Sequence, residues 1–193
     1  MSSAREPAPN DPAPDGAAAT VAYIAIGANL GDRAATMREA IRRLGATEGV
    51  RVVACSSAYD TAPVGPPDQP RYLNAAAAVE TTLGARALLG VLLDIERTLG
   101  RERSSTRWTA RTIDLDLILF GECVESGGDS SAGSLSVPHP RFRERAFVLV
   151  PLAEIAPAAR DPVTGERIES LLRACPGRSD AVKAGPFCDL PLG

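Results

Sequence analysis

The stretch Arg111-Thr-Ile-Asp-Leu-Asp-Leu-Ile-Leu-Phe120 places two carboxylates in a run of branched aliphatic residues. This composition predicts a buried β-strand, on which successive side chains point to opposite faces. Asp114 and Asp116 are therefore expected on one face. The other face is expected to carry the aliphatic residues Ile113, Leu115, Leu117 and Leu119. Two carboxylates about 6.6 Å apart on a buried face repel each other and lose hydration, which a hard cation such as magnesium would offset.

The competing interpretation of this stretch is an edge strand with a solvated polar face, on which an Asp-x-Asp pair is common and inert. Two observations favour a site. Ile118 and Phe120 are expected to continue the aspartate face as apolar residues, and residues 97–111 carry five arginines but a single acid, Glu102. Arginines suit phosphate oxygens and carboxylates suit a metal, so the combination indicates nucleotide phosphate chemistry. The chain has no P-loop motif and no protein-kinase motif.

Hydrophobic patterning elsewhere predicts strands separated by helices. Strands are expected over residues 21–26, 50–59, 72–82 and 112–120, and helices over residues 34–44, 85–99, 146–155 and 168–174. The alanines of residues 72–82 would also suit a helix, and Pro151 would kink the third helix. The order of elements predicts a two-layer α/β or α+β sandwich of roughly four to six strands with helices on its faces.

The bulk composition is that of one domain, because the chain has 193 residues, of which 45% are hydrophobic and 23% charged. We expect a disordered leader over residues 1–19, a single domain over residues 20–175 and a flexible tail over residues 176–193. The Gly/Ser stretch 126–134 is expected to be an exposed loop.

The net charge of −3 argues against a surface built to hold nucleic acid or an anionic membrane. No segment has the pattern of a secretory signal or a membrane span, so a cytoplasmic protein is expected. The four cysteines are far apart in a chain with one histidine, which suggests neither a zinc site nor a disulfide framework. Reduced thiols are the expected state.

Four blocks of the sequence, in this order, resemble the 6-hydroxymethyl-7,8-dihydropterin pyrophosphokinase family. They are Ala25-Ile-Gly-Ala-Asn-Leu-Gly31, Gly65-Pro-Pro-Asp-Gln-Pro-Arg-Tyr-Leu-Asn-Ala75, Arg107-Trp-Thr-Ala-Arg-Thr-Ile-Asp-Leu-Asp116 and Val137-Pro-His-Pro-Arg141. The resemblance extends over roughly residues 21–174. It implies a ferredoxin-like α+β fold with a mostly antiparallel sheet, and transfer of the diphosphate of ATP to the hydroxymethyl group of the pterin, with release of AMP.

The resemblance also implies roles for individual residues. Asp114 and Asp116 match the ligands of two magnesium ions, and Arg101 and Arg111 match further catalytic residues. The ATP-binding set implied by the family is Glu96, Arg101, Arg103, Arg107, Trp108, Arg111, Leu117, His139 and Arg145. In this interpretation the arginine-bearing segment forms a lid, and Trp108 seals the site from water. Without the family, the arginines would be a solvated loop, Trp108 a packed anchor, His139 a capping or core group and Glu96 part of a surface salt bridge.

The pterin-binding set implied by the family is Thr61, Val64, Tyr72, Asn74, Trp108 and Phe147. Tyr72 and Asn74 lie two residues apart on a predicted strand and so share a face. The Asn74 amide can donate and accept, as the edge of a pterin requires, and the rings of Tyr72 and Phe147 would stack on the pterin. From the residues alone, both aromatic residues would more simply be core residues.

Three positions depart from frequent family residues, namely Ala62, Ser104 and Pro140. They put individual nucleotide contacts in doubt and leave the metal pair and the pterin slot intact. The expected binding partners are ATP and the pterin. The protein is expected to be a monomer. Two other classes stay open. An RNA-binding module on a ferredoxin-like sheet would also use arginines and aromatics, and a metal-dependent phosphohydrolase would also use paired acids.

Overall fold

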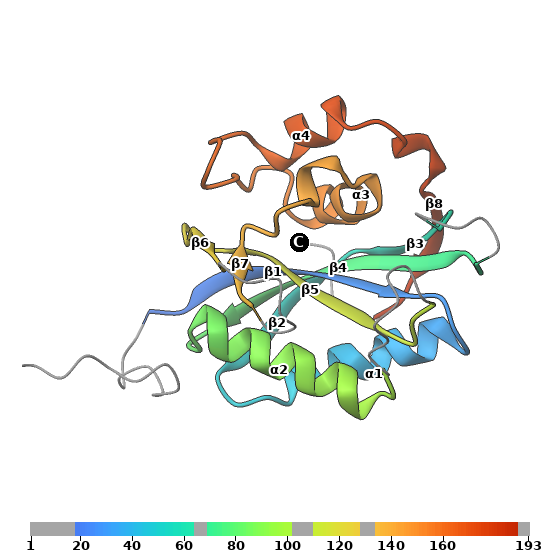
Figure 1. The fold of residues 1–193 in the computed structure, drawn as a ribbon, viewed down its shortest axis with the longest axis horizontal. Helices are drawn as coiled ribbons and strands as arrows, with labels where there is room; N and C mark the ends of the chain where they lie inside the picture. Colours follow the sequence, from blue (N-terminus) through green and yellow to red (C-terminus); the bar gives the residue numbers. More distant parts are fainter. Residues whose placement is uncertain (1–17, 64–68, 102–109, 128–133, 189–193) are drawn as a thin grey trace, which may run out of the picture.

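A six-stranded antiparallel sheet forms the centre of the computed structural model (Figure 1), which describes residues 18–63, 69–101, 110–127 and 134–188. Its strands are β1 (Thr20–Ala28), β2 (Val50–Cys55), β3 (Ser57–Thr61), β4 (Tyr72–Thr81), β5 (Asp114–Phe120) and β8 (Val182–Pro186). They follow the order β5-β1-β4-β3-β8, and β2 also pairs with β4. A separate small hairpin consists of β6 (Glu125–Ser126) and β7 (Ser136–Val137).

Helices cover both faces of this sheet (Figure 1). They are α1 (Arg33–Gly45), α2 (Ala85–Thr98), α3 (Ala146–Ile155) and α4 (Ile168–Ala174), with short 3₁₀ helices at Phe142–Glu144 and Arg178–Asp180. Helices α1 and α2 pack on one face, and α3 packs on the other with α4 on its outer side, which gives two buried cores. The order β1-α1-β2/β3-β4-α2-β5 is a β-α-β-β-α-β arrangement. The expected ferredoxin-like α+β fold with a mostly antiparallel sheet is confirmed.

The helix α1 shows how local sequence sets these elements. Asp32 caps its N-terminus, since the Asp32 carboxylate accepts the N–H of Ala35 at 3.0 Å. Met37, Ile41 and Leu44, spaced for one helical face, are all buried against the sheet, as the pattern predicted.

The predicted strand over residues 50–59 is two strands, because the chain breaks at Ser56. The Ser56 hydroxyl accepts the N–H of Ala76 at 2.9 Å, in place of a backbone carbonyl. The same hydroxyl donates to the carbonyl of Ser57 at 2.7 Å. A side chain therefore replaces one step of the ladder to β4, and the chain resumes as β3.

A bulge in β5 overturns part of the predicted alternation. Ile24 pairs with Leu117 and Tyr23 with Leu119, so Ile118 is an extra residue on β5. Beyond this bulge the faces exchange. Leu119 packs in the core under α3, whereas Phe120 packs on the α1–α2 core. The expectations that Leu119 shares the face of Leu117 and that Phe120 shares the aspartate face are both wrong.

The C-terminal segment differs from the flexible tail expected from the sequence. Val182–Pro186 forms β8, which pairs with β3 at the edge of the sheet. Phe187 follows and is buried in the α1–α2 core, and Lys183 Nζ lies 2.8 Å from Glu154 Oε1 on α3. The expected leader and most of the expected 126–134 loop lie outside the described residues. Among the helices that the structure does describe, none is both long and apolar enough to cross a membrane.

Candidate active site

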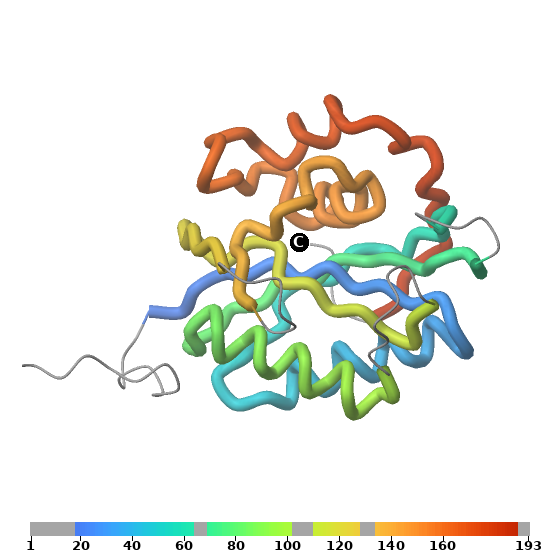
Figure 2. The backbone as a smooth tube through the Cα atoms, viewed as in Figure 1, coloured from blue at the N-terminus to red at the C-terminus, as the bar shows by residue number. Residues whose placement is uncertain are grey.

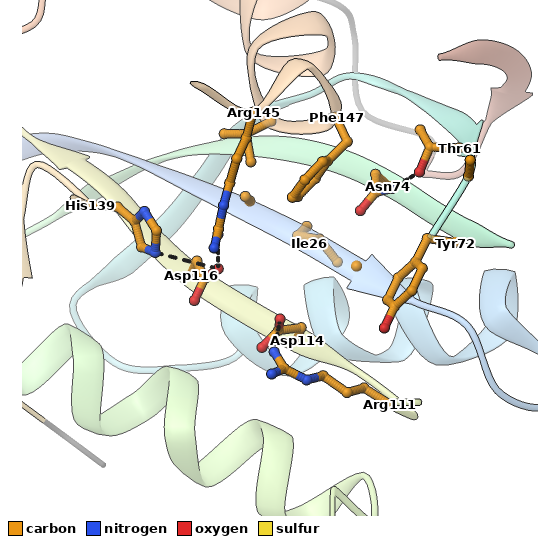
Figure 3. A pocket seen from close by; sticks show the side chains of 14 residues that line it. Ile26, Thr61, Tyr72, Asn74, Arg111, Asp114, Asp116, His139, Arg145 and Phe147 are labelled. Carbon is orange, nitrogen blue, oxygen red and sulfur yellow. Dashed lines mark hydrogen bonds and ion pairs between the residues drawn. The ribbon is translucent and has the colours of Figure 1, made fainter. Parts of the chain in front are cut away.

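A cavity of about 270 Å³ opens beside the N-terminus of α3, on the face of the sheet that α3 covers (Figure 3). Four strands, β1, β3, β4 and β5, contribute its lining along with α3 and the loops that carry Ala62, Arg111, His139 and Arg145. Its residues are Ala25, Ile26, Gly27, Thr61, Ala62, Tyr72, Asn74, Arg111, Asp114, Asp116, His139, Arg145, Phe147 and Val148. The cavity thus brings together nine residues that the sequence analysis assigned to the site, from segments up to 86 positions apart in the chain (61 to 147).

Asp114 is the compensated member of the aspartate pair. Arg101 Nη1 lies 2.5 Å from Asp114 Oδ1, and Arg111 Nη1 pairs with the other carboxylate oxygen. Two guanidinium groups therefore share one carboxylate. This places Arg101 and Arg111, both predicted catalytic residues, beside the predicted metal ligand.

Asp116 lacks such close cations. The nearest described basic nitrogens are Arg145 Nη1 at 3.8 Å and His139 Nε2 at 4.0 Å, both measured to Asp116 Oδ2. Burial and the neighbouring charge of Asp114 raise the pKa of Asp116 to about 7, although Arg145 opposes the shift. The cavity therefore holds a carboxylate for which ionisation is costly unless a further positive charge is supplied.

His139 is held with one nitrogen directed at Asp116, as Figure 3 shows. The backbone N–H of His139 donates to the carbonyl of Ile118 at 2.9 Å, and its Nδ1 accepts the N–H of Arg141 at 3.2 Å. Burial and the positive charge of Arg145 lower the pKa of His139 to about 4. The ring is therefore neutral near pH 7, and because Nδ1 accepts, the proton resides on Nε2 and faces the cavity.

The opposite end of the cavity is a slot between two aromatic rings. Tyr72 and Phe147 border it, and the buried Asn74 lies between them (Figure 3). Asn74 Nδ2 donates to Thr61 Oγ1 at 2.7 Å, which fixes the amide and leaves its oxygen available. The cation of Arg145 lies 5.6 Å from the centre of the Phe147 ring and joins the two ends of the cavity.

Gly27 is a residue that the sequence analysis left without a role in the site. It is the cross-strand partner of Asn74, and a Cβ at this position would approach Asn74 Oδ1 to 3.0 Å. A side chain here would therefore force the Asn74 amide to shift by a few tenths of an ångström. The Gly27-x-Asn29 spacing within the first family block was the available signal.

Asn29 is the second residue whose role in the site was not predicted from the sequence. Its side-chain oxygen accepts the N–H of Arg111 at 2.6 Å, and its Nδ2 donates to the carbonyl of Pro70 at 3.3 Å. The buried amide thus ties the chain before β5 to the chain before β4. Both of those segments supply cavity residues, so Asn29 sets the distance between Arg111 and Tyr72.

Two predicted ATP-binding residues have their side chains on the other face of the sheet. Leu117 is buried in the α1–α2 core, so its side chain does not line the cavity. Glu96 is also buried, which excludes the surface salt bridge considered for it. It accepts the N–H of Leu115 at 2.7 Å and pairs with Arg101, so it acts beneath the site.

Four predicted site residues cannot be placed. Val64, Arg103, Arg107 and Trp108 lie outside the described residues, as does Ser104. Within the described part of the chain, no group of three or more His, Cys, Asp or Glu side chains is arranged to hold a metal ion. Among the described residues that line the cavity, the acidic side chains available to a metal are therefore those of Asp114 and Asp116.

Comparisons with a family model and with known proteins all find pterin pyrophosphokinases. Residues 23–157 match the family model described as 7,8-dihydro-6-hydroxymethylpterin-pyrophosphokinase. A 2-amino-4-hydroxy-6-hydroxymethyldihydropteridine pyrophosphokinase of Methylorubrum extorquens is 49% identical over 138 residues, which are 72% of this chain and 84% of that protein. The protein of the same name from Bacillus subtilis is 46% identical over 136 residues, or 70% and 77% of the two chains.

A solved structure supports the fold. The HPPK-DHPS triple mutant of Plasmodium falciparum, crystallised with SDX-DHP, superimposes with a TM-score of 0.65 over 84% of this chain. Its sequence is 13% identical, and the match spans 45% of that longer chain. At this identity the likeness concerns the fold alone.

Proposed function

The chain belongs to the 7,8-dihydro-6-hydroxymethylpterin-pyrophosphokinase family, and we propose that the cavity beside α3 is its active site. There the chain transfers the diphosphate of ATP to the hydroxymethyl group of 6-hydroxymethyl-7,8-dihydropterin and releases AMP, a step of folate biosynthesis. One observation carries the assignment of the site. The slot between Tyr72 and Phe147, which holds the Asn74 amide, opens onto Asp116. The neighbouring cations do not fully offset the charge of this carboxylate.

The slot is the proposed pterin subsite. Tyr72 and Phe147 offer ring faces to a flat heterocycle, and Asn74 offers a fixed amide to its edge. Because Thr61 already holds the Asn74 amide, the slot is organised before the substrate arrives, which lowers the entropy cost of binding. Val64 and Trp108 are proposed to complete this subsite from segments outside the described residues.

The cationic end is the proposed subsite for the phosphates of ATP. Arg101, Arg111 and Arg145, which lie beside the aspartate pair, are proposed to bind phosphate oxygens, as guanidinium groups do in bidentate geometry. His139 presents an N–H and no charge, so we assign it as a phosphate hydrogen-bond donor and not as a base. Arg103, Arg107 and Trp108 are proposed as lid residues that exclude water, which would otherwise compete for the same phosphorus.

Asp114 and Asp116 are the proposed magnesium ligands. The donor set fits, because carboxylate and phosphate oxygens are the ligands that magnesium prefers, and Asp116 requires a positive charge that nearby side chains do not fully supply. Bound magnesium would orient the phosphates and neutralise their charge. Asp116 is also the candidate to accept the proton of the pterin hydroxyl. For Glu96 we propose an indirect role, which is to hold Arg101 from below.

The two other classes considered from the sequence fit less well. RNA-binding modules of this fold read bases on an open sheet face, whereas α3 covers that face here. A phosphohydrolase would be expected to supply more metal ligands than the two aspartates found among the described residues. The monomeric state and the cytoplasmic location stay predictions.

One assay tests the proposal. The protein is incubated with ATP, magnesium and 6-hydroxymethyl-7,8-dihydropterin, and nucleotide products are separated by chromatography. We expect AMP only when the pterin is present. Phosphate release without pterin would indicate a hydrolase, and no product at all would contradict both enzymatic assignments.

A pair of variants tests the subsite assignment. Asn74→Ala should raise the KM for the pterin at least about tenfold, with a much smaller change in the KM for ATP. Thr36→Ala, a polar substitution on exposed α1 far from the cavity, is the control and should behave as the wild type. Equal changes in both KM values for Asn74→Ala would argue against a pterin slot at this end.

A further inference from the structure

The C-terminal strand brings two cysteines together away from the proposed active site. Ser57 on β3 pairs with Pro186 on β8 in antiparallel register. Cys55, the last residue of β2, and Cys188 each lie two residues beyond this pair, at the same end of the ladder. Figure 2 shows the C-terminal segment, in red, running down past the edge of the sheet. Both cysteines pack in the α1–α2 core, and neither lines the active-site cavity.

The two thiols interact in the reduced protein. Neither cysteine is in a disulfide, and burial together with contact from the Cys188 thiol raises the pKa of the Cys55 thiol. Their accessibility differs, since Cys55 is 1% exposed whereas Cys188 is only partly buried. A small solute can therefore reach the pair through Cys188.

The backbone geometry suits a bond between the two sulfurs. Directly opposed residues of antiparallel strands have Cβ atoms about 4.5–5.5 Å apart, and a disulfide needs about 3.5–4.5 Å. The missing distance, about 1 Å, can come from β8. This strand lies at the edge of the sheet, and all of its residues except Gly185 are exposed, so its pairing with β3, the Lys183–Glu154 contact and the buried Phe187 are the contacts that must adjust to a small shift.

We propose that Cys55 and Cys188 form a redox-sensitive pair, which a hydroperoxide converts into a disulfide that ties the C-terminal strand to the sheet. The Cys188 thiolate attacks a peroxide oxygen and breaks the O–O bond, which leaves a sulfenic acid and, after protonation, water. The Cys55 sulfur then attacks the sulfenic sulfur, and the departing hydroxide takes the Cys55 proton. Two thiols lose two electrons in total, and one hydrogen peroxide becomes two molecules of water.

The bond would change the stability of the protein more than its chemistry. It closes the long loop from residue 55 to residue 188, and cross-links across long loops restrict the unfolded chain most. We expect oxidation to raise the Tm by about 5–15 °C. It would also hold β8 against β3, the strand that ends at the cavity residue Thr61.

The test uses the full chain, reduced and freed of reductant, and then treated with hydrogen peroxide. Intact mass and a digest prepared without reductant are measured by mass spectrometry, and the Tm is followed by circular dichroism. We expect a loss of about 2 Da, a peptide that joins Cys55 to Cys188, and a raised Tm that dithiothreitol reverses.

Two variants control the experiment. Cys188→Ser, with Cys188→Ala as a second version should the first fold poorly, should give neither the linked peptide nor the rise in Tm. Cys123→Ser removes a cysteine outside the pair and should respond as the wild type does. Oxygen adducts or covalent dimers without the Cys55–Cys188 peptide would overturn the proposal, and so would a linked peptide with no change in Tm.

Discussion

Asp161 and Asp116 are two carboxylates enclosed by the same fold, and their surroundings are opposite. Asp161, 0% exposed, accepts from Arg143 Nε at 2.6 Å, Arg143 Nη2 at 2.7 Å, Thr164 Oγ1 at 2.7 Å and the N–H of Val163 at 3.1 Å. The nearest cation to Asp116 is Arg145, with Nη1 at 3.8 Å, and the neutral His139 lies at 4.0 Å. One carboxylate is fully partnered within the protein and the other is not.

The difference separates a structural carboxylate from a functional one. Burial disfavours the charge of Asp161, but the hydrogen bonds from Arg143, Thr164 and Val163 outweigh it and lower the pKa of Asp161. Around Asp116 burial and the charge of Asp114 dominate, so its pKa is raised to about 7. A half-buried carboxylate whose basic neighbours stay at a distance costs stability, and such a cost is commonly found where a ligand or metal is to bind.

The most severe test is the same substitution at both positions, beginning with Asp116→Asn. We expect the rate of AMP formation to fall at least about 10³-fold, because the charge that would hold magnesium is lost. Folding should be unaffected or slightly stabilised, as a neutral amide replaces a strained carboxylate. Steady-state kinetics and urea denaturation measure the two effects. Asp94→Asn, on exposed α2, is the matched control, and an active Asp116→Asn enzyme would remove Asp116 from the metal assignment.

Asp161→Asn should have the reverse outcome. The free energy of unfolding should fall by about 3 kcal/mol, because Arg143 loses its buried partner. The kcat of the protein that remains folded should stay within about twofold of the wild type, since Asp161 does not line the cavity. Denaturation curves and kinetics at 15 °C give both values. A large loss of kcat in fully folded protein would show that the two carboxylates are not separate in function.

The pH dependence of stability should distinguish the two carboxylates without metal. The lowered pKa of Asp161 stabilises the fold above about pH 4, where the unfolded carboxyl ionises, so the deficit of Asp161→Asn should shrink in stronger acid. With its pKa raised to about 7, Asp116 keeps its proton in the folded state, so the wild type should lose stability relative to Asp116→Asn as the pH rises from about 4 to 7. Urea denaturation in EDTA at several pH values measures both differences, and parallel curves would contradict the comparison.

The environment of Glu96 is intermediate between those of Asp161 and Asp116, and its substitution should have the smallest effect of those considered. One of its oxygens accepts from Leu115, but Oε2 is buried without a hydrogen-bond partner among the described residues, and burial raises the pKa of Glu96. Glu96→Gln should therefore change the free energy of unfolding by less than about 1 kcal/mol, because lower desolvation cost offsets the weaker contact with Arg101. A fall in kcat/KM of less than about tenfold is expected. Glu80→Gln, at a surface ion pair, is the control, and a loss as large as that of Asp116→Asn would give Glu96 a direct role.

The sequence predicted the elements whose cause is local. Helices α1 and α2 follow from apolar residues at helical spacing, and the shared face of Asp114 and Asp116 follows from strand alternation over two residues. The alternation failed beyond Ile118, because a bulge depends on the pairing of β5 with β1 and not on the residues of β5 alone. The strand β8 was missed for a similar reason. Val182–Pro186 has no strand pattern, and its partner lies more than a hundred residues earlier in the chain.

Site residues that lie in a family motif could be predicted from the sequence. Residues whose role depends on a contact with a distant part of the chain were harder to predict. Asn74 and Thr61 were assigned separately, and only the fold shows that the Asn74 amide donates a hydrogen bond to the Thr61 hydroxyl. Asn29 was given no role in the site, since its partners, Arg111 and Pro70, come from two distant loops. Leu117 was assigned to ATP, although its side chain follows the core face of the strand.

The close approach of Gly27 to Asn74 has a consequence for inhibition. Any side chain at residue 27 would press on the amide oxygen that the pterin is proposed to use. An inhibitor that fills the slot and bonds this amide would therefore meet a target with little freedom to mutate. A substitution at residue 27 that displaces the drug would displace the substrate as well, so resistance would have to arise elsewhere around the cavity.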